Sequence, residues 1–361
     1  MAVTLTEEDL GTRIEAVLRR RFAERTVAAE HYGAEFAALW HTAAEHALGG
    51  KLLRPRMLMD LLSALTAAPL TAKDTARAID VAAHVELLHF AFLLHDDVID
   101  GDLTRRRRRP NLIGSLVSRR PDAGGEAALH WGRSSAILLG DLLLSSAVLG
   151  FARADIPAAR RERLLALLET TVFETVAGEH SDVALSDGII AADLRTILST
   201  SASKTAAYSF VLPLRAAAIL SGASTAAEEQ LTEIGGHLGL AYQLQDDLLS
   251  VFGDPDTHGK DPYSDLREGK ETAIIAYARM TSHWPGIELR FGATDLSIDD
   301  AAEMRDRLRE CGAEGFVRGL VEEQLTAVST VLAEAEEAGT LSADAGRVVL
   351  ALADRIEGRS R

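Results

Sequence analysis

The sequence contains a single cysteine, Cys311, among 361 residues, and only 5% of its residues are aromatic. One cysteine can form neither an internal disulfide nor a thiolate metal cluster, and it fits a reducing compartment. Long hydrophobic runs are also missing, because stretches such as 136–152 are interrupted by Asp141 and fall short of the roughly 20 residues that span a bilayer. The first 22 residues mix acids and bases, unlike a signal peptide. We therefore expect a cytoplasmic protein without a membrane span.

Positive charge is scarce as well. The chain has 38 Lys and Arg residues against 54 Asp and Glu residues, for a net charge of −16. Such a chain repels nucleic acids and anionic membranes at long range, so we expect no nucleic-acid partner. Hydrophobic residues make up 47% of the chain and charged residues 25%, the composition of an ordinary folded protein. This composition excludes intrinsic disorder.

The alternation of β-branched residues that is typical of strands is nearly absent, whereas apolar residues recur at helical spacing almost throughout. No linker is long enough to separate domains, so we expect one all-α domain over residues 1–361, a large helical bundle around a central cavity. Two stretches, 102–125 and 253–269, are expected to be irregular because they are rich in Arg or in Gly, Pro and Asp. The predicted helices span residues 6–31, 34–47, 51–67, 72–99, 127–151, 156–185, 191–219, 224–251, 270–281, 298–311, 313–337 and 342–357.

Two predicted helices end in similar aspartate clusters. HDDVID contains Asp96, Asp97 and Asp100, and QDDLLSVFGD contains Asp246, Asp247 and Asp254. Carboxylates at a helix C-terminus meet the negative end of the helix dipole, so they need cations nearby. Oxygen ligands without His or Cys favour Mg²⁺, which can bridge carboxylates to phosphates. One such cluster is as often a solvated helix end, but two that face each other in a bundle can clamp a diphosphate through metal ions.

A diphosphate site also needs direct cationic ligands, which Arg and Lys provide. Each basic residue alone is more often a surface residue, and the arginine run alone could be a nucleic-acid patch, although the net charge argues against that. The basic residues near the predicted cavity are Lys51 and Arg54 in GGKLLRP, the run Arg105–Arg109, and Lys204, Lys260 and Lys270 near or after helix ends.

Together these residues resemble the trans-isoprenyl diphosphate synthases, which elongate an allylic diphosphate with isopentenyl diphosphate. The family's motifs occur in order over most of the chain: GGKLLRP (49–55), ELLHFAFLLHDDVID (86–100), the Arg run before Pro110, GEHSDV (178–183), SKTAAYSF (203–210), YQLQDDLLSVFGD (242–254) and HGKDPYSDLREGK (258–270). The resemblance implies the isoprenoid synthase helical fold, both diphosphates as substrates, several Mg²⁺ ions as cofactor and a homodimer.

The resemblance also implies a role for each matching residue. The metal ligands would be Asp96, Asp97, Asp100, Asp246 and Asp247. Isopentenyl diphosphate would be bound by Lys51, Arg54, His89 and an arginine of the run. The allylic diphosphate would be bound by Lys204, Lys260 and another arginine of the run, Arg105 and Arg106 being the candidates. Thr205 and Gln243 would line the reaction centre.

Three departures from the family's pattern stand out. The usual RRGxP is replaced by RRRRRP, which lacks the glycine and is about one residue longer, so the assignment of Arg105 and Arg106 stays open by one position. The usual Gln after Gly178 is Glu179. The second aspartate motif has Ser250 and Asp254, a spacing that approximates the metal triad of class I terpene cyclases. A cyclase has no second substrate and no need for GGKLLRP or His89, so we predict elongation, with cyclisation as the alternative. A non-catalytic subunit is disfavoured because both the aspartates and the basic ligands are present.

Product length would depend on residues upstream of Asp96. In the enzymes that the chain resembles, the bulk of such residues sets the floor of the pocket for the growing chain. Here these positions hold Leu88, Ala91 and Phe92. One small and one large residue predict an intermediate depth, so geranylgeranyl diphosphate is the expected product, with the farnesyl or C25 diphosphate as alternatives.

Overall fold

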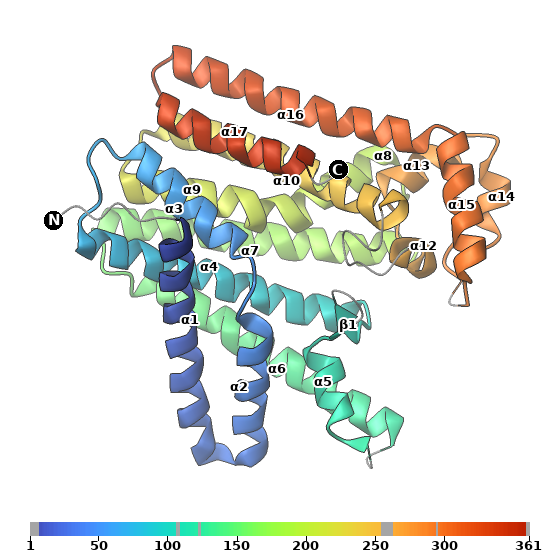
Figure 1. Ribbon diagram of the computed structural model, residues 1–361, viewed down its shortest axis with the longest axis horizontal. Helices are drawn as coiled ribbons and strands as arrows, with labels where there is room; N and C mark the ends of the chain where they lie inside the picture. The colour runs from blue at the N-terminus through green and yellow to red at the C-terminus, as the bar shows by residue number, and fades with distance from the viewer. Residues whose placement is uncertain (1–6, 106–108, 122–123, 254–262, 294, 359–361) are drawn as a thin grey trace. The chain divides into compact units, whose positions relative to one another are not determined.

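The computed structural model describes residues 7–105, 109–121, 124–253, 263–293 and 295–358 (Figure 1). It divides into two compact units, the first comprising Met1–Ala166 with Ile219–Gly222 and the second Leu167–Ala218 with Ala223–Arg361. In the described ranges, the strands are one antiparallel pair in the first unit and the regular structure is otherwise helical. The all-α prediction is confirmed, while the assignment of residues 1–361 to one domain stays a prediction.

The first unit is built around α4, a long helix that packs against α1, α3 and α6 (Figure 1). Thr71 begins α4, because its side chain accepts a hydrogen bond from the backbone N–H of Asp74 at 3.1 Å. Phe22 packs against Trp40 and Phe90, with ring centroids 6.1 and 6.4 Å apart. The elements are α1 (Glu7–Ala29), η1 (Glu30–Tyr32), α2 (Ala34–Ala47), α3 (Leu53–Leu65), α4 (Ala72–Ile99), β1 (Thr104–Arg105), β2 (Arg109–Pro110), α5 (Leu112–Ser118), α6 (Gly125–Ala152) and the first part of α7 (Ala158–Ser186).

The second unit is built around α10, which packs against η3 and α16. Ser224 caps the start of α10 by accepting a hydrogen bond from the backbone N–H of Ala227 at 3.2 Å. Besides the rest of α7, the elements are α8 (Leu194–Ser201), η3 (Ala202–Val211), α9 (Leu212–Ser221), α10 (Thr225–Phe252), α12 (Ser264–Glu268), α13 (Ala273–Arg279), α14 (Trp284–Glu288), α15 (Ile298–Glu310), α16 (Ala313–Glu337) and α17 (Ala343–Glu357).

Most predicted helices end within a few residues of the observed ones, and 34–47, 72–99 and 313–337 agree at both ends. The helix predicted over 191–219 is found as an unbroken helical run from Leu194 to Ser221, but its type changes within the run, from α8 to the π-helix η3 and then to α9. A π-helix keeps the apolar pattern of a helix but adds a residue to each turn, so periodicity does not distinguish it.

The two stretches expected to be irregular contain short helices. In the first, the side chain of Asn111 accepts a hydrogen bond from the backbone N–H of Gly114 at 2.8 Å and so begins α5. In the second, Gly269 ends α12 in a left-handed conformation with φ 69°. Local capping residues therefore form helices where composition favoured loops.

Two helices, α4 and α6, are long and apolar enough to cross a membrane by length and composition alone. The most apolar window of α4 is 67% buried, as in the core helix of a soluble protein, whereas that of α6 is 39% buried. Core helices of soluble proteins pass the same test, so the expected absence of a membrane span stays a prediction.

Candidate functional site

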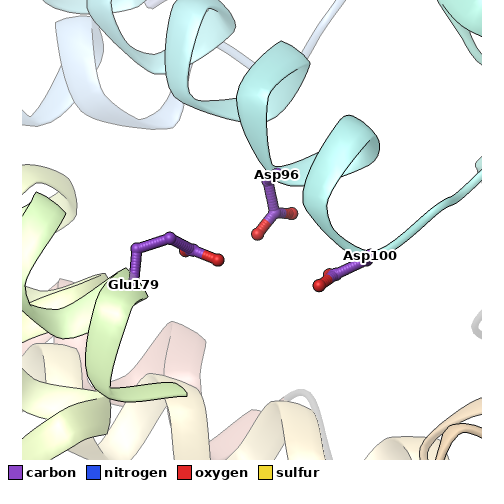
Figure 2. Close-up of side chains that lie close together, drawn as sticks. All are labelled: Asp96, Asp100 and Glu179. Atoms are coloured by element: carbon purple, nitrogen blue, oxygen red, sulfur yellow. The ribbon is translucent and has the colours of Figure 1, made fainter. Parts of the chain in front are cut away.

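The first aspartate cluster lies at the C-terminal end of α4, in the first unit. Figure 2 shows the side chains of Asp96 and Asp100 on the same side of the last turns, as their spacing of four residues requires. Asp100 is exposed and forms the C-cap, with its N–H bonded to the carbonyl oxygen of Asp96 at 2.9 Å. Asp97, between them, is only 2% exposed. Two carboxylates are thus accessible to a ligand and one is buried.

Arg105 compensates part of this negative charge. Its Nε donates to Oδ1 of Asp97 at 2.6 Å, and its Nη2 lies 3.3 Å from Oδ2 of Asp96. The same Nη2 donates to the carbonyl oxygen of Leu93 at 3.2 Å, which fixes the guanidinium against the last turns of α4. Burial raises the pKa of Asp97 to about 6, although the Arg105 guanidinium opposes this shift.

Arg105 was predicted to bind a diphosphate, and the structure instead engages it with the aspartates of α4. Arg105 lies in β1, where the chain turns back beside the end of α4. Its guanidinium therefore lies within ion-pair distance of both Asp96 and Asp97. Arg106, the other candidate, lies outside the described residues. The role of both arginines toward a diphosphate stays a prediction.

The three residues predicted to bind isopentenyl diphosphate belong to the first unit. Lys51 is exposed just before α3, Arg54 is half-buried in the first turn of α3, and His89 is half-buried on α4, about two turns before Asp96. Leu52 has a left-handed backbone with φ 51° at the start of α3. A leucine in this conformation is strained, and such strain is typical of functional loops.

The loop also runs close to α4. A Cβ atom on Gly50 would lie 4.0 Å from Oε1 of Glu86, one turn before His89. The GGKLLRP loop therefore passes beside the part of α4 that carries His89.

In the second unit, a chain of hydrogen bonds joins η3 to α10. The hydroxyl of Thr205 donates to Oε1 of Gln243 at 2.9 Å, and Nε2 of Gln243 donates to Oδ1 of Asp247 at 2.8 Å. Thr205 lies in the π-helix, a feature that is often found at functional sites. The sequence predicts these three residues in one site, and two hydrogen bonds join them in the structure, with Gln243 in the middle.

Lys204, the neighbour of Thr205, is held by two carboxylates of α7. Its Nζ lies 2.6 Å from Oδ2 of Asp182 and 3.1 Å from Oε2 of Glu179. A side chain on Gly178 would collide with the backbone of Lys204, so only glycine allows η3 to approach α7 this closely. The residue after that glycine, where the family usually has Gln, therefore supplies a second negative charge to Lys204.

Gly239 plays the same part on α10. A Cβ atom there would collide with the backbone and side chain of Ala206, whereas one on Gly236 would meet no neighbouring segment of the described chain within 4 Å. The close contact between η3 and α10 is what brings Thr205 within hydrogen-bond distance of Gln243.

Lys270 is one of the basic residues singled out in the sequence, but its interaction with Asp247 of the second aspartate cluster was not predicted. Burial lowers its pKa, but the carboxylates of Asp265 and Asp247 raise it more, and the net pKa lies well above the ordinary value. Burial raises the pKa of Asp247 to about 7, with Lys270 acting in the opposite direction. Lys270, Asp247, Gln243, Lys204 and Asp182 are among the residues that line one small cavity of about 30 Å³. The signal that could have revealed Lys270 was its place in the REGK segment that follows the second aspartate motif.

The remaining predicted residues are placed as follows. Ser250 is buried, with its hydroxyl 3.5 Å from that of Ser264 at the start of α12. Asp254 and Lys260 lie outside the described residues. On α4, Leu88 and Ala91 are fully buried and Phe92 is half-buried.

Residues 37–285 match the polyprenyl synthetase family. The chain is 32% identical over 281 residues to the (2E,6E)-farnesyl diphosphate synthase of Mycobacterium tuberculosis, covering 73% of this chain and 67% of that enzyme. It is 33% identical over 235 residues to the geranylfarnesyl diphosphate synthase of Aeropyrum pernix, covering 64% and 66%. The crystal structure of geranylgeranyl pyrophosphate synthase from Corynebacterium glutamicum, complexed with isoprenyl diphosphate and magnesium, aligns with a TM-score of 0.84 at 27% identity, covering 96% of this chain and 99% of that chain.

Proposed function

Because the chain belongs to the polyprenyl synthetase family and is a trans-prenyl diphosphate synthase, we propose that it extends allylic diphosphates with isopentenyl diphosphate as far as geranylgeranyl diphosphate. The relatives make products of different lengths, so overall similarity does not select one. The observation that carries the proposal is the size of the side chains on α4 between the buried Leu88 and Asp96. The small Ala91 leaves room for the growing prenyl chain, while Phe92, one turn before Asp96, limits that room.

Magnesium fits the residues that are present, and the family is in general magnesium-dependent. Asp97 and Asp247 are buried carboxylates, and burial raises the pKa of each by more than the nearby cations Arg105 and Lys270 lower it. Their donor atoms are oxygens, which Mg²⁺ prefers. We propose that Asp96, Asp97, Asp100, Asp246 and Asp247 would hold the ions. When bound, Mg²⁺ supplies positive charge that stabilises a departing diphosphate.

The side chains of the second unit suit the allylic substrate. Lys204 is a cation held by two carboxylates, and we propose that it donates to the diphosphate oxygens as the bond to C1 breaks. The oxygens of Thr205 and Gln243 present dipoles that stabilise the allylic cation. In the first unit, Lys51, Arg54 and His89 hold isopentenyl diphosphate.

The reaction needs no protein nucleophile. The double bond of isopentenyl diphosphate forms the new carbon–carbon bond to C1 of the allylic cation, and the diphosphate leaves with the electron pair of the broken C–O bond. A proton then leaves the isopentenyl unit, and the departed diphosphate takes it up, which regenerates an allylic diphosphate. Water must be excluded while the cation exists.

Product analysis tests the proposal. Purified protein with Mg²⁺ is incubated with isopentenyl diphosphate and, separately, the C5, C10 and C15 allylic diphosphates, and the products are identified by mass. A series that stops at C20 is expected. If the series stops at C15 or C25, that diphosphate is the product instead of the proposed one. A hydrocarbon or alcohol formed without elongation would favour the alternative, a terpene cyclase, which the spacing of Ser250 and Asp254 suggests.

Phe92→Ala tests the pocket floor. Removing the ring opens space below the reaction centre, so the main product should lengthen by one or more C5 units, as seen by mass. Phe316→Ala, a change of the same size on α16 in the second unit, is the control and should leave the length unchanged. An unaltered product profile for Phe92→Ala would remove this residue from the floor.

We also propose that the enzyme works in the cytoplasm as a homodimer, with α6 in the interface. Its single cysteine suits a reducing compartment. One side of α6 exposes Ile137, Leu138, Leu142 and Val148 at 41–61%, an apolar stripe of the kind that protein interfaces cover. Light scattering after chromatography should give twice the chain mass for the native protein and a monomer for Leu138→Glu/Leu142→Glu.

A further inference from the structure

A second cavity lies within the first unit, away from the aspartates. Its volume is about 380 Å³, and it is lined by residues of α1, α2, α4 and α6. The buried side chains of Phe22, Trp40, Leu87 and Leu143 give it an apolar floor. His84, which also lines it, precedes Asp96 by twelve residues on α4, or about 18 Å along the helix axis.

Close packing of α4 and α6 shapes one end of this cavity. A Cβ atom on Gly150 would collide with the imidazole ring of His84, so the ring rests directly on the backbone of α6. One turn earlier on α6, the small side chain of Ser146 lines the cavity and leaves its volume open.

The rim of the cavity is cationic. Its titratable groups are Arg21, Glu24, Arg25, Asp80, His84 and Arg153. The two acids already have partners: Oδ1 of Asp80 accepts from Arg21 at 2.5 Å, and Glu24 lies 3.9 Å from Arg20.

The arginines keep unused donors. Arg25 and Arg153 are exposed and make no ion pair with the residues that the structure describes. Nε of Arg21 is buried and has no hydrogen-bond partner among the described residues. His84 adds no positive charge to the rim, because burial lowers the pKa of its imidazole. Its Nδ1 donates to the carbonyl oxygen of Asp80 at 2.7 Å.

We propose that this cavity binds an amphipathic anion, with an apolar chain on the aromatic floor and a phosphate or carboxylate head between Arg25 and Arg153. Guanidinium groups bind such oxyanions through paired hydrogen bonds, and the volume falls in the range of small-molecule pockets. A prenyl diphosphate has this chemistry, and so does a single-chain lipid phosphate. That the ligand is the enzyme's own product rests on the proposed function; the binding chemistry does not.

Tryptophan fluorescence tests the proposal, because Trp40 lines the cavity. The variant Trp131→Phe/Trp284→Phe leaves Trp40 as the only tryptophan. It is titrated with the unreactive geranylgeranyl thiolodiphosphate in EDTA, so that binding at the aspartates is suppressed. We expect a saturable change of Trp40 emission. Ser146→Trp fills the cavity and should abolish binding, which is measured with a radiolabelled ligand because the variant adds a tryptophan. Circular dichroism confirms that this variant is folded.

Charge reversal supplies the matched control. Arg25→Glu/Arg153→Glu should weaken binding by at least about tenfold, since each lost guanidinium removes a charge-assisted hydrogen bond. Arg19→Glu/Arg347→Glu makes the same change of charge at exposed residues whose partners, Glu15 and Asp344, lie outside the cavity lining, and it should change affinity less than twofold. Equal effects of the two double variants, or no response of Trp40 up to the solubility of the ligand, would overturn the proposal.

Three probes distinguish the sources of the ligand. Binding of the thiolodiphosphate in preference to dodecyl phosphate supports the enzyme's own product, and equal binding of both supports a general single-chain lipid phosphate. Inorganic pyrophosphate should bind at least tenfold more weakly than either, and equally tight binding would overturn the role of the apolar floor. The readout does not require turnover, so a failure here and a failure of the proposed function are separate results.

Discussion

The two units compensate a buried aspartate in different ways. In the first, Asp97 meets Arg105, only eight residues further along the chain, at 2.6 Å. In the second, Asp247 accepts a hydrogen bond from the neutral side chain of Gln243, which in turn accepts one from Thr205. The nearby cation is Lys270, which follows α12 in the chain and lowers the pKa of Asp247. A local hairpin suffices for the first arrangement, whereas the second requires η3 to pack against α10. In both units, burial raises the pKa of the aspartate by more than the nearby cation lowers it.

Removing each carboxylate is the strongest way to test this comparison. Asp247→Asn should lower kcat/KM by roughly 10³-fold, in the range of lost electrostatic stabilisation of a transition state. Asp97→Asn should cost less, on the order of 10²-fold, because Asp97 is already paired with the charged guanidinium of Arg105, whereas the group that donates to Asp247 is the neutral amide of Gln243. Steady-state kinetics at saturating Mg²⁺ measure both.

Asp187→Asn, an exposed position at the end of α7, serves as the control and should leave kcat/KM within about twofold of the native value. Equal losses for the Asp97 and Asp247 variants would contradict the difference between the units.

The packing that the second unit needs can be broken at one glycine. Gly239→Ala should destabilise the protein by about 1–3 kcal/mol, because the new methyl group collides with Ala206. It should also lower activity, since η3 carries Lys204 and Thr205. Thermal unfolding followed by circular dichroism measures the change.

Gly236→Ala is the matched control on the same helix. Apart from the backbone of its own helix, the added Cβ would contact no atom of the described residues within 4 Å, and alanine favours a helix over glycine by up to about 1 kcal/mol, so Tm should stay level or rise. Similar losses of stability in the two variants would contradict the close approach of η3 and α10.

The sequence predicted the site of the first unit better than that of the second. Helical periodicity and the HDDVID motif predicted α4 and the position of Asp96 and Asp100, because both depend on local spacing. The salt bridges of Lys204 could not be predicted, since Asp182 lies 22 residues away and reaches Lys204 only through the close approach at Gly178. Asn111 caps the start of α5, and an asparagine before an apolar segment is a common helix start. The arginine-rich composition around it favours a loop, so α5 was not predicted.

Acid should act on both units, but at different pH values. A raised pKa means that the folded protein favours the protonated carboxyl, so metal binding must displace a proton below about pH 7 at Asp247 and below about pH 6 at Asp97. The Mg²⁺ concentration for half-maximal activity should therefore rise as the pH falls from about 8 to about 6. Magnesium titrations of activity at each pH measure this.

The Asp97→Asn variant sharpens the test. It should keep the rise near pH 7, which belongs to Asp247, and lose the further rise near pH 6. A magnesium requirement that does not change with pH would contradict the assignment of these carboxylates to the metal.

The smallest expected effect concerns Glu179, the departure from the family's usual Gln. Its carboxylate lies 3.1 Å from Nζ of Lys204, whereas Asp182 lies at 2.6 Å, so Glu179 is the weaker of the two partners. Glu179→Gln keeps the shape but removes the charge. Lys204 should then be freer to bind an allylic diphosphate, and the KM for that substrate should fall about twofold to fivefold, the scale of one partly exposed ion pair.

Asp182→Asn gives the contrast, because it removes the shorter contact and should alter KM more than Glu179→Gln does. A rise in KM for Glu179→Gln that excess Mg²⁺ reverses would contradict a restraining role on Lys204. In that case the extra carboxylate would serve the metal rather than the lysine, and its place beside Lys204 would be a consequence of the glycine that precedes it.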